Sequence, residues 1–152
     1  MNMKKFWALM LSLAMALSLA ACGGDSGSSD GDAANDAEGS GDKVVRIGVF
    51  EPATGDSGPG GKQEMLGMQY ANQETPTVDI GGETYTVELV YADNGSDSSK
   101  AITAASELVS KDVSLVLGSY GSGVSIAAGP TFDEAGLAAI GVTCTNPQVT
   151  AG

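Results

Sequence analysis

Residues 118–123 bring together hydroxyl and glycine residues that could hold a small anionic ligand. The stretch reads Gly-Ser-Tyr-Gly-Ser-Gly and follows a short apolar run of buried-strand type, residues 114–117. A helix-like segment over residues 124–135 comes next. A loop between a strand and a helix start presents free backbone N–H groups and hydroxyls at one point. We therefore predict that this loop binds the carboxylate of a small ligand and forms the floor of a cleft.

Strands and helices are predicted to alternate around this loop. The strands are expected over residues 43–50, 85–92, 113–117 and 137–142, and the helices over residues 62–74, 98–111 and 124–135. A tight hairpin through Gly81 and Gly82 leads into the second strand. This order predicts an α/β fold, a parallel sheet with helices on both faces and right-handed crossovers.

Two of the predicted helices carry a detail that a structure can check. The pattern in residues 98–111 predicts one apolar face, formed by Ile102, Ala105, Leu108 and Val109. The last helix contains Gly129 and Pro130, and a proline inside a helix is expected to bend it or to shorten its first half.

The loops that follow the four strands are predicted to meet at one edge of the sheet. In open parallel sheets, ligands bind outside the carboxyl ends of the strands. All four loops are rich in Gly, Ser, Thr, Asn or Asp: residues 51–61, 93–97, 118–123 and 143–148. One such loop is often only a turn, but four at one edge favour a binding cleft. Asp93 either caps the following helix or lines the cleft, and capping is the favoured interpretation.

The N-terminal part of the chain is predicted to direct and tether the protein. Residues 1–21 have the paired lysines and the apolar run of a secretion signal. The sequence Leu-Ala-Ala-Cys that ends at Cys22 resembles the bacterial lipobox, which implies cleavage before Cys22 and lipidation of its thiol. The alternative is an ordinary secretion signal with a free cysteine near the cut. Residues 22–42 are small and acidic, so we expect a disordered linker.

Composition excludes several classes of function. The formal net charge is −12 and the sequence has no histidine. The acidity argues against binding to nucleic acid and against docking flat on anionic lipid. The lack of histidine excludes His-based catalysis and His metal sites. Cys144 has no partner if Cys22 is lipidated, and we expect a small, buried or half-buried thiol. We predict no catalytic site, no metal site and no cofactor.

Three short motifs carry a resemblance to a known family. They are Val-Leu-Gly-Ser-Tyr-Gly-Ser ending at Ser122, Asp-Glu-Ala-Gly ending at Gly136, and Thr-Asn-Pro-Gln-Val-Thr beginning at Thr145. With them, residues 43–152 resemble the N-terminal lobe of the branched-chain amino acid (Leu/Ile/Val-binding) family of ABC-transporter substrate-binding proteins. The resemblance implies a periplasmic-binding-protein type I fold, in which two α/β lobes close on a ligand. This chain would be an incomplete N-terminal fragment of that fold.

The resemblance also implies a function and a place in the cell. Members of the family capture a small solute outside the cell, here an amino acid of branched-chain or related type, and deliver it to an ABC permease in the membrane. The lipobox implies that a bacterial protein of this kind is anchored to the outer face of the cell membrane, with the lipid as its only membrane contact.

The resemblance assigns ligand-binding positions as well. In members that bind amino acids, the first lobe holds the ligand's α-carboxylate and α-ammonium groups. Matched position by position, the ligand-binding residues are Ser122, Thr143, Thr145, Tyr120 and Gly121. Gly60 stands where some members place an aromatic residue that covers the ligand side chain. Tyr120 either supplies that cover or lies on the rim of the cleft.

Two other classes of function have the same general pattern. A ligand-sensing extracellular domain of a receptor or regulator uses the same fold, and a membrane helix and signalling module downstream would indicate it. A hydrolase or a flavodoxin-like domain shares the alternation of strands and helices. Residues 121–123 lack the Gly-x-Ser-x-Gly spacing of a hydrolase, however, and Gly61-Lys62 is followed by Gln63 instead of the Ser or Thr of a P-loop.

Overall fold

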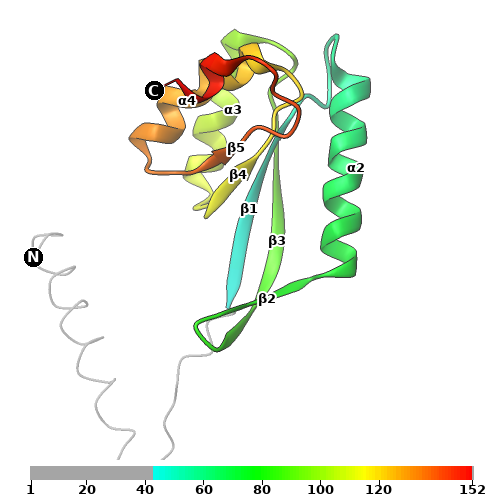
Figure 1. The fold of residues 1–152 in the computed structure, drawn as a ribbon, viewed down its shortest axis with the longest axis vertical. Coiled ribbons are helices and arrows are strands. Elements are labelled where there is room, and N and C mark those ends of the chain that lie inside the picture. Colours follow the sequence, from blue (N-terminus) through cyan, green and yellow to red (C-terminus); the bar gives the residue numbers. More distant parts are fainter. Residues whose placement is uncertain (1–42, 152) are drawn as a thin grey trace, which may run out of the picture. The chain divides into compact units, whose positions relative to one another are not determined.

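A computed structural model describes residues 43–151 of the chain. The predicted signal, Cys22 and the acidic linker lie outside the described residues. The elements follow in the order β1 (Val44–Glu51), α2 (Gly58–Glu74), β2 (Thr77–Ile80), β3 (Glu83–Asp93), α3 (Ser98–Ser110), β4 (Leu115–Leu117), α4 (Ser122–Glu134), β5 (Ala139–Ile140) and the 3-10 helix η1 (Pro147–Thr150) (Figure 1).

The strands form one sheet in the order β2-β3-β1-β4-β5. β1 pairs in parallel with β3 and β4, and β4 pairs in parallel with β5. The edge strand β2 is antiparallel to β3, so the sheet is mixed. Gly81 and Gly82 turn the chain straight back between these two strands, with φ of +64° and +87°. Such positive φ values favour glycine, and the predicted hairpin is confirmed.

Helices cover both faces of the sheet, as predicted. α3 and α4 lie together on one face and α2 lies along the other (Figure 1). The main core is on the α3–α4 side, where the rings of Phe50 and Phe132 meet edge to face with centroids 5.4 Å apart. Leu108 and Val116 are fully buried beside them. α2 contributes only two buried residues, both glycines, so its side of the sheet is much less filled.

The predicted boundaries and faces differ from the structure, most clearly in α2, α3, α4 and β5. α2 begins at Gly58, four residues before the predicted start, because Pro59 suits the first turn of a helix. In α3 the side chain of Ile102 is 52% exposed, and alanines allow the close contact with α4 instead. α4 continues unbroken past Pro130, so the predicted shortening was wrong. The last strand has only two residues in place of the predicted six.

None of the helices within residues 43–151 is long and apolar enough to cross a membrane.

Candidate ligand-binding site

The loops after the parallel strands meet at one edge of the sheet, as predicted. The loop after β1 donates the Ala53 N–H to Asp93 at the end of β3, over 2.8 Å. Glu51, the last residue of β1, accepts the N–H of Tyr120, also over 2.8 Å. The Thr143 hydroxyl then donates to the Tyr120 carbonyl over 3.3 Å. Hydrogen bonds therefore join all the predicted cleft loops into one continuous surface.

Ser122 holds the loop after β5 against the start of α4. Its Oγ accepts hydrogen bonds from the N–H groups of Thr145, at 3.1 Å, and Asn146, at 3.3 Å. A serine hydroxyl has two acceptor lone pairs and one donor proton. Both lone pairs are used here, so the Ser122 proton is the part of this group that can still bond to a ligand. The side chains of Thr143 and Thr145 are exposed on the same surface.

The N-terminus of α4 lies at the centre of this surface without a side-chain cap. Its N-cap is Gly121, which has no side chain to accept from the first-turn N–H groups. Unpaired N–H groups and the positive end of the helix dipole together favour a negatively charged acceptor. A carboxylate is such an acceptor, and the Ser122 proton lies in the same turn of the helix.

Asp93 has a structural role that differs from the predicted one. Asp97 caps α3, accepting the N–H of Ser99 over 2.7 Å, so the interpretation of Asp93 as the cap was wrong. Asp93 instead binds the loop after β1 and its own turn. Partial burial acts to raise the pKa of Asp93, but hydrogen bonds from the Thr54 hydroxyl and three backbone N–H groups outweigh it and lower the pKa. These bonds keep the carboxylate ionised, and they link the end of β3 to the loop after β1.

Comparison with known proteins identifies the family. A family model described as "Periplasmic binding protein" matches residues 44–152. The chain belongs to the periplasmic binding protein family. An amino acid binding protein of Pseudomonas aeruginosa is 37% identical over 108 residues, which is 70% of this chain and 28% of the relative.

Solved structures agree with this assignment. A leucine binding protein of Thermotoga maritima superposes with a TM-score of 0.66 at 34% identity, over 72% of this chain and 30% of that chain. A branched-chain amino acid transporter substrate binding protein of Streptococcus pneumoniae, in complex with isoleucine, gives a TM-score of 0.64 at 28% identity, over 72% of this chain and 32% of that one. The chain thus matches one lobe of the type I fold and spans about a third or less of these relatives.

In this periplasmic binding protein, the ring of Tyr120 fills the space beside Gly60. A Cβ added at Gly60 would lie 2.5 Å from the Cε2 atom of Tyr120, so a side chain at this position would require the Tyr120 ring to move. The Tyr120 side chain is 44% exposed, so part of the ring faces solvent. The floor loop, residues 118–121, thus places an aromatic ring beside Gly60, the position where the resemblance expects an aromatic residue in some members.

Glu51 was not among the residues predicted for the site. Its side chain is 1% exposed, and its Oε2 accepts the Tyr120 N–H while its Oε1 has no partner in the described part of the chain. Burial, and then the neighbouring Glu64 carboxyl group, raise the pKa of Glu51 to about 8. A carboxylate directly after the apolar run of residues 47–50 was the available sequence signal.

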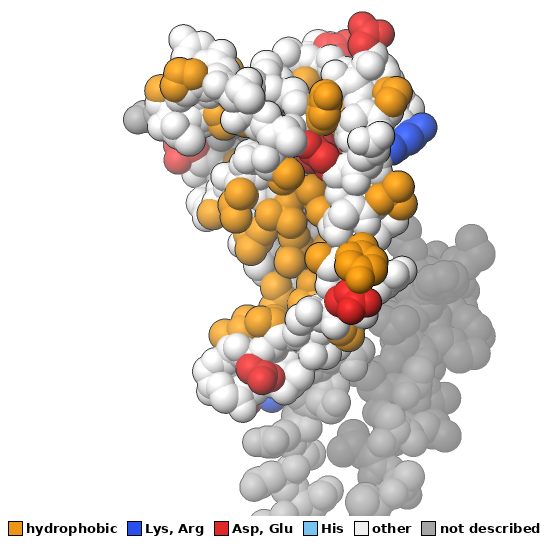
Figure 2. Space-filling view, turned by 45° about the vertical axis from the view of Figure 1, so that its right-hand side comes forward, with side chains coloured by type: hydrophobic (Ala, Val, Ile, Leu, Met, Phe, Trp, Pro, Cys, Tyr) orange, Lys and Arg blue, Asp and Glu red, His pale blue; other side chains and the backbone are white. Residues whose placement is uncertain are grey.

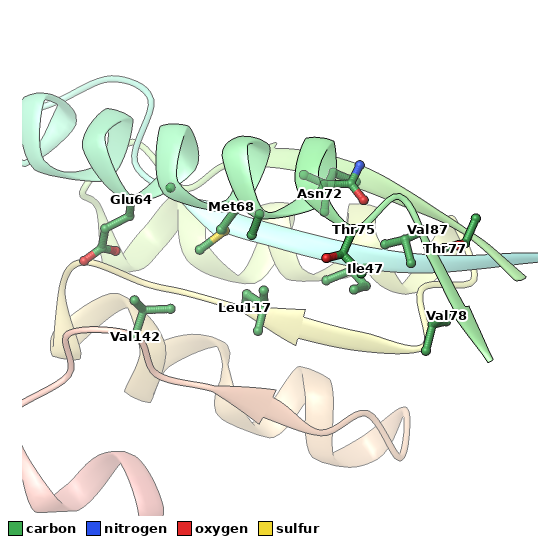
Figure 3. Close-up of a pocket in the computed structure, with 13 residues that line it drawn as sticks. Ile47, Glu64, Met68, Asn72, Thr75, Thr77, Val78, Val87, Leu117 and Val142 are labelled. Carbon is green, nitrogen blue, oxygen red and sulfur yellow. The ribbon is translucent and has the colours of Figure 1, made fainter. Parts of the chain in front are cut away.

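An apolar cavity lies on the α2 side of the sheet. It is an open cavity of about 680 Å³ between α2 and strands β1, β2, β3 and β4. Figure 2 shows a band of hydrophobic side chains on this face, and Figure 3 shows Met68 of α2 opposite Leu117 of β4. Ser122, Thr143 and Thr145 do not line this cavity, whereas Val142 does. The predicted ligand-binding residues therefore belong to the loop surface and not to this cavity.

The remaining predictions for the site concern cysteine and metal chemistry. The Cys144 thiol is half-buried and free, as predicted, and donates to the Ser119 carbonyl over 3.4 Å. No group of three or more acidic or cysteine residues in the described part of the chain has the arrangement of a metal site.

Proposed function

We propose that the chain forms part of a solute-binding protein of an ABC importer, which captures an amino acid and delivers it to the membrane permease. The observation that carries the proposal is the uncapped N-terminus of α4, with the free proton of Ser122 beside it. The names of the relatives support the choice of solute, since they include an amino acid binding protein and a leucine binding protein. Proteins of this kind bind their solutes and do not transform them.

The binding mode follows from the hydrogen-bonding capacity of each group. The solute carboxylate accepts from the first-turn N–H groups of α4 and from the Ser122 hydroxyl. The Thr143 hydroxyl has already donated its proton to Tyr120, so its oxygen accepts from the solute ammonium group. The exposed Thr145 hydroxyl can donate or accept on the same surface. The Tyr120 ring covers the solute side chain from the floor loop.

Two substitutions test this binding mode. Ser122→Ala and Thr145→Ala are each expected to weaken amino acid binding by about 1–3 kcal/mol, because each leaves a polar solute group without its partner. Titration calorimetry with L-leucine measures the affinity. Thr145→Ala keeps the backbone bond from Thr145 to Ser122, so its effect reports the lost hydroxyl alone.

Ser110→Ala provides the matched control. The Ser110 hydroxyl bonds to the Glu107 carbonyl at the end of α3, and the residue is exposed. This variant should bind as the unmodified protein does. Equal affinities for the Ser122 and Thr145 variants and this control would refute the binding mode.

The proposal includes a lipid anchor at Cys22, on the outer face of the bacterial cell membrane. Cys22 directly follows the apolar core of the predicted signal. Cys22→Ser is expected to move the protein from the membrane fraction to the medium, because the attached acyl chains supply the membrane affinity. Cys144→Ser is the control and should stay with the membrane. Immunoblots of the two fractions make the measurement, and an unchanged distribution of Cys22→Ser would contradict the anchor.

A further inference from the structure

Two buried carboxyl groups meet beneath the floor loop without a donor between them. Oε1 of Glu51 and both carboxyl oxygens of Glu64 are buried and have no hydrogen-bond partner in the described part of the chain. The two carboxyl groups lie close enough to each other for Glu64 to raise the pKa of Glu51. Figure 3 shows Glu64 extending from α2 toward the backbone that follows β4. An ionised carboxylate can only accept, so a hydrogen bond between the two groups would need a proton on one of them.

Within residues 43–151, neither carboxyl group forms a salt bridge. The ion pairs in the described residues are Lys43–Glu83, Arg46–Glu88 and Lys111–Glu107. The other titratable groups around Glu51 belong to neighbouring elements. Asp93 is its register partner on β3, but that carboxylate is bonded to the loop after β1, and the Cys144 thiol is bonded to the Ser119 carbonyl. Two buried like charges would repel strongly, which favours one shared proton.

We propose that Glu51 and Glu64 share one proton, and that this shared-proton link positions the floor loop for solute binding. Oε1 of Glu51 carries the proton and donates it to Glu64, while Oε2 accepts the Tyr120 N–H. The link thereby joins β1, α2 and the floor loop. Gly118 leaves room for the Glu51 carboxyl group, since a Cβ at position 118 would lie 2.7 Å from the Glu51 Oε1. Glu51 is a positioning residue, and only the part of the proposal that concerns solute binding depends on the proposed function.

The pH dependence follows from the chemistry of the pair. Burial and Glu64 together raise the pKa of Glu51 to about 8, so the proton is present at neutral pH and is lost above it. When it is lost, two negative charges face each other across the contact between α2 and β1. Separation of these charges moves the Tyr120 ring, because the Tyr120 N–H is bonded to the same carboxyl group.

Carbon NMR of the full chain with labelled glutamate tests the shared proton without any solute. The Glu51 carboxyl carbon should titrate with a midpoint near pH 8, and the Tyr120 amide resonance should follow the same midpoint. In Glu64→Gln the midpoint should fall by at least about one pH unit, because a neutral amide replaces the opposing charge. In Glu74→Gln, at an exposed position on the same helix, it should not change. An ordinary midpoint near 4.5 for Glu51, or a Tyr120 amide resonance that does not shift as Glu51 titrates, would overturn the proposal.

A pH profile of L-leucine binding tests the positioning role. Between pH 7 and pH 9 the affinity should fall about tenfold, in step with the loss of one proton of pKa near 8. Glu51→Gln should make the profile flat, since its amide donates to Glu64 at every pH and its carbonyl oxygen still accepts from Tyr120. A flat profile in the unmodified protein would overturn the positioning role. Lack of binding at every pH would instead contradict the proposed function. The NMR titration alone would then test whether Glu51 and Glu64 share a proton and whether the floor loop responds to its loss.

Discussion

Gly118→Ala is expected to destabilise the domain by more than about 4 kcal/mol, enough to prevent folding. A Cβ at this position would lie 2.3 Å from the Phe50 carbonyl oxygen and 2.7 Å from the Glu51 Oε1. The backbone φ of +121° is also one that side chains other than hydrogen rarely adopt. Neither Phe50 nor Glu51 can move away, because both are fully buried. Denaturant unfolding followed by circular dichroism measures the loss.

Gly67→Ala is the matched control for this substitution. Gly67 lies within α2, and a Cβ there meets nothing within 4 Å. Alanine favours a helix interior over glycine, so this variant should gain about 0.5–1 kcal/mol. If the two variants unfolded at the same denaturant concentration, the tight packing of the floor loop against β1 would be wrong.

The second large effect is a loss of stability between about pH 4.5 and pH 8. Glu51 has an ordinary pKa of 4.5 when unfolded and a pKa of about 8 when folded. A raised folded-state pKa means that the native protein binds the proton more tightly than the unfolded chain does. The contribution of Glu51 to the free energy of unfolding is therefore fully present below pH 4.5 and is lost as the pH rises through 8. The free energy of unfolding should fall by roughly 3–5 kcal/mol over this window.

Glu51→Gln should remove this slope and raise the stability at neutral pH. Asp93 and Asp97 have pKa values lowered from 3.8, so their contributions to stability are lost as the pH falls. That loss occurs at more acidic pH than the Glu51 window and does not overlap with it. Denaturant unfolding at a series of pH values compares the two proteins. Parallel pH curves for the unmodified protein and Glu51→Gln would show that Glu51 does not titrate in this range.

The order of elements and the meeting of the loops could be predicted from the sequence because they depend on local patterns. Apolar runs, Gly/Ser loops and the hairpin glycines each act within a few residues. The contacts of the site side chains were harder to predict from the sequence, because their partners come from distant parts of the chain. Asp93 binds Ala53, forty residues earlier, and no local pattern distinguishes that role from capping, which Asp97 performs.

The same limit applies to the helix faces and to the buried acid. Ile102 was predicted to be buried because it is apolar at helical spacing, but the approach of α4 selects the face of α3 that is rich in alanine. The unusual state of Glu51 depends on burial beneath the floor loop and on Glu64 from α2. Neither can be derived from a sequence window around Glu51. Ser122 was predicted to bind the ligand, but its bonds to Thr145 and Asn146 appear only in the structure.

The most direct test of the central claim is an NMR titration of the labelled protein with the common L-amino acids, one at a time. If the loop surface binds the solute carboxylate, the largest amide shifts should fall on Gly121, Ser122 and Gly123 at the start of α4, and on Thr145. Branched-chain amino acids should give the strongest response. Shifts confined to the apolar cavity around Met68 and Leu89, or no shifts with any amino acid, would contradict binding at this surface.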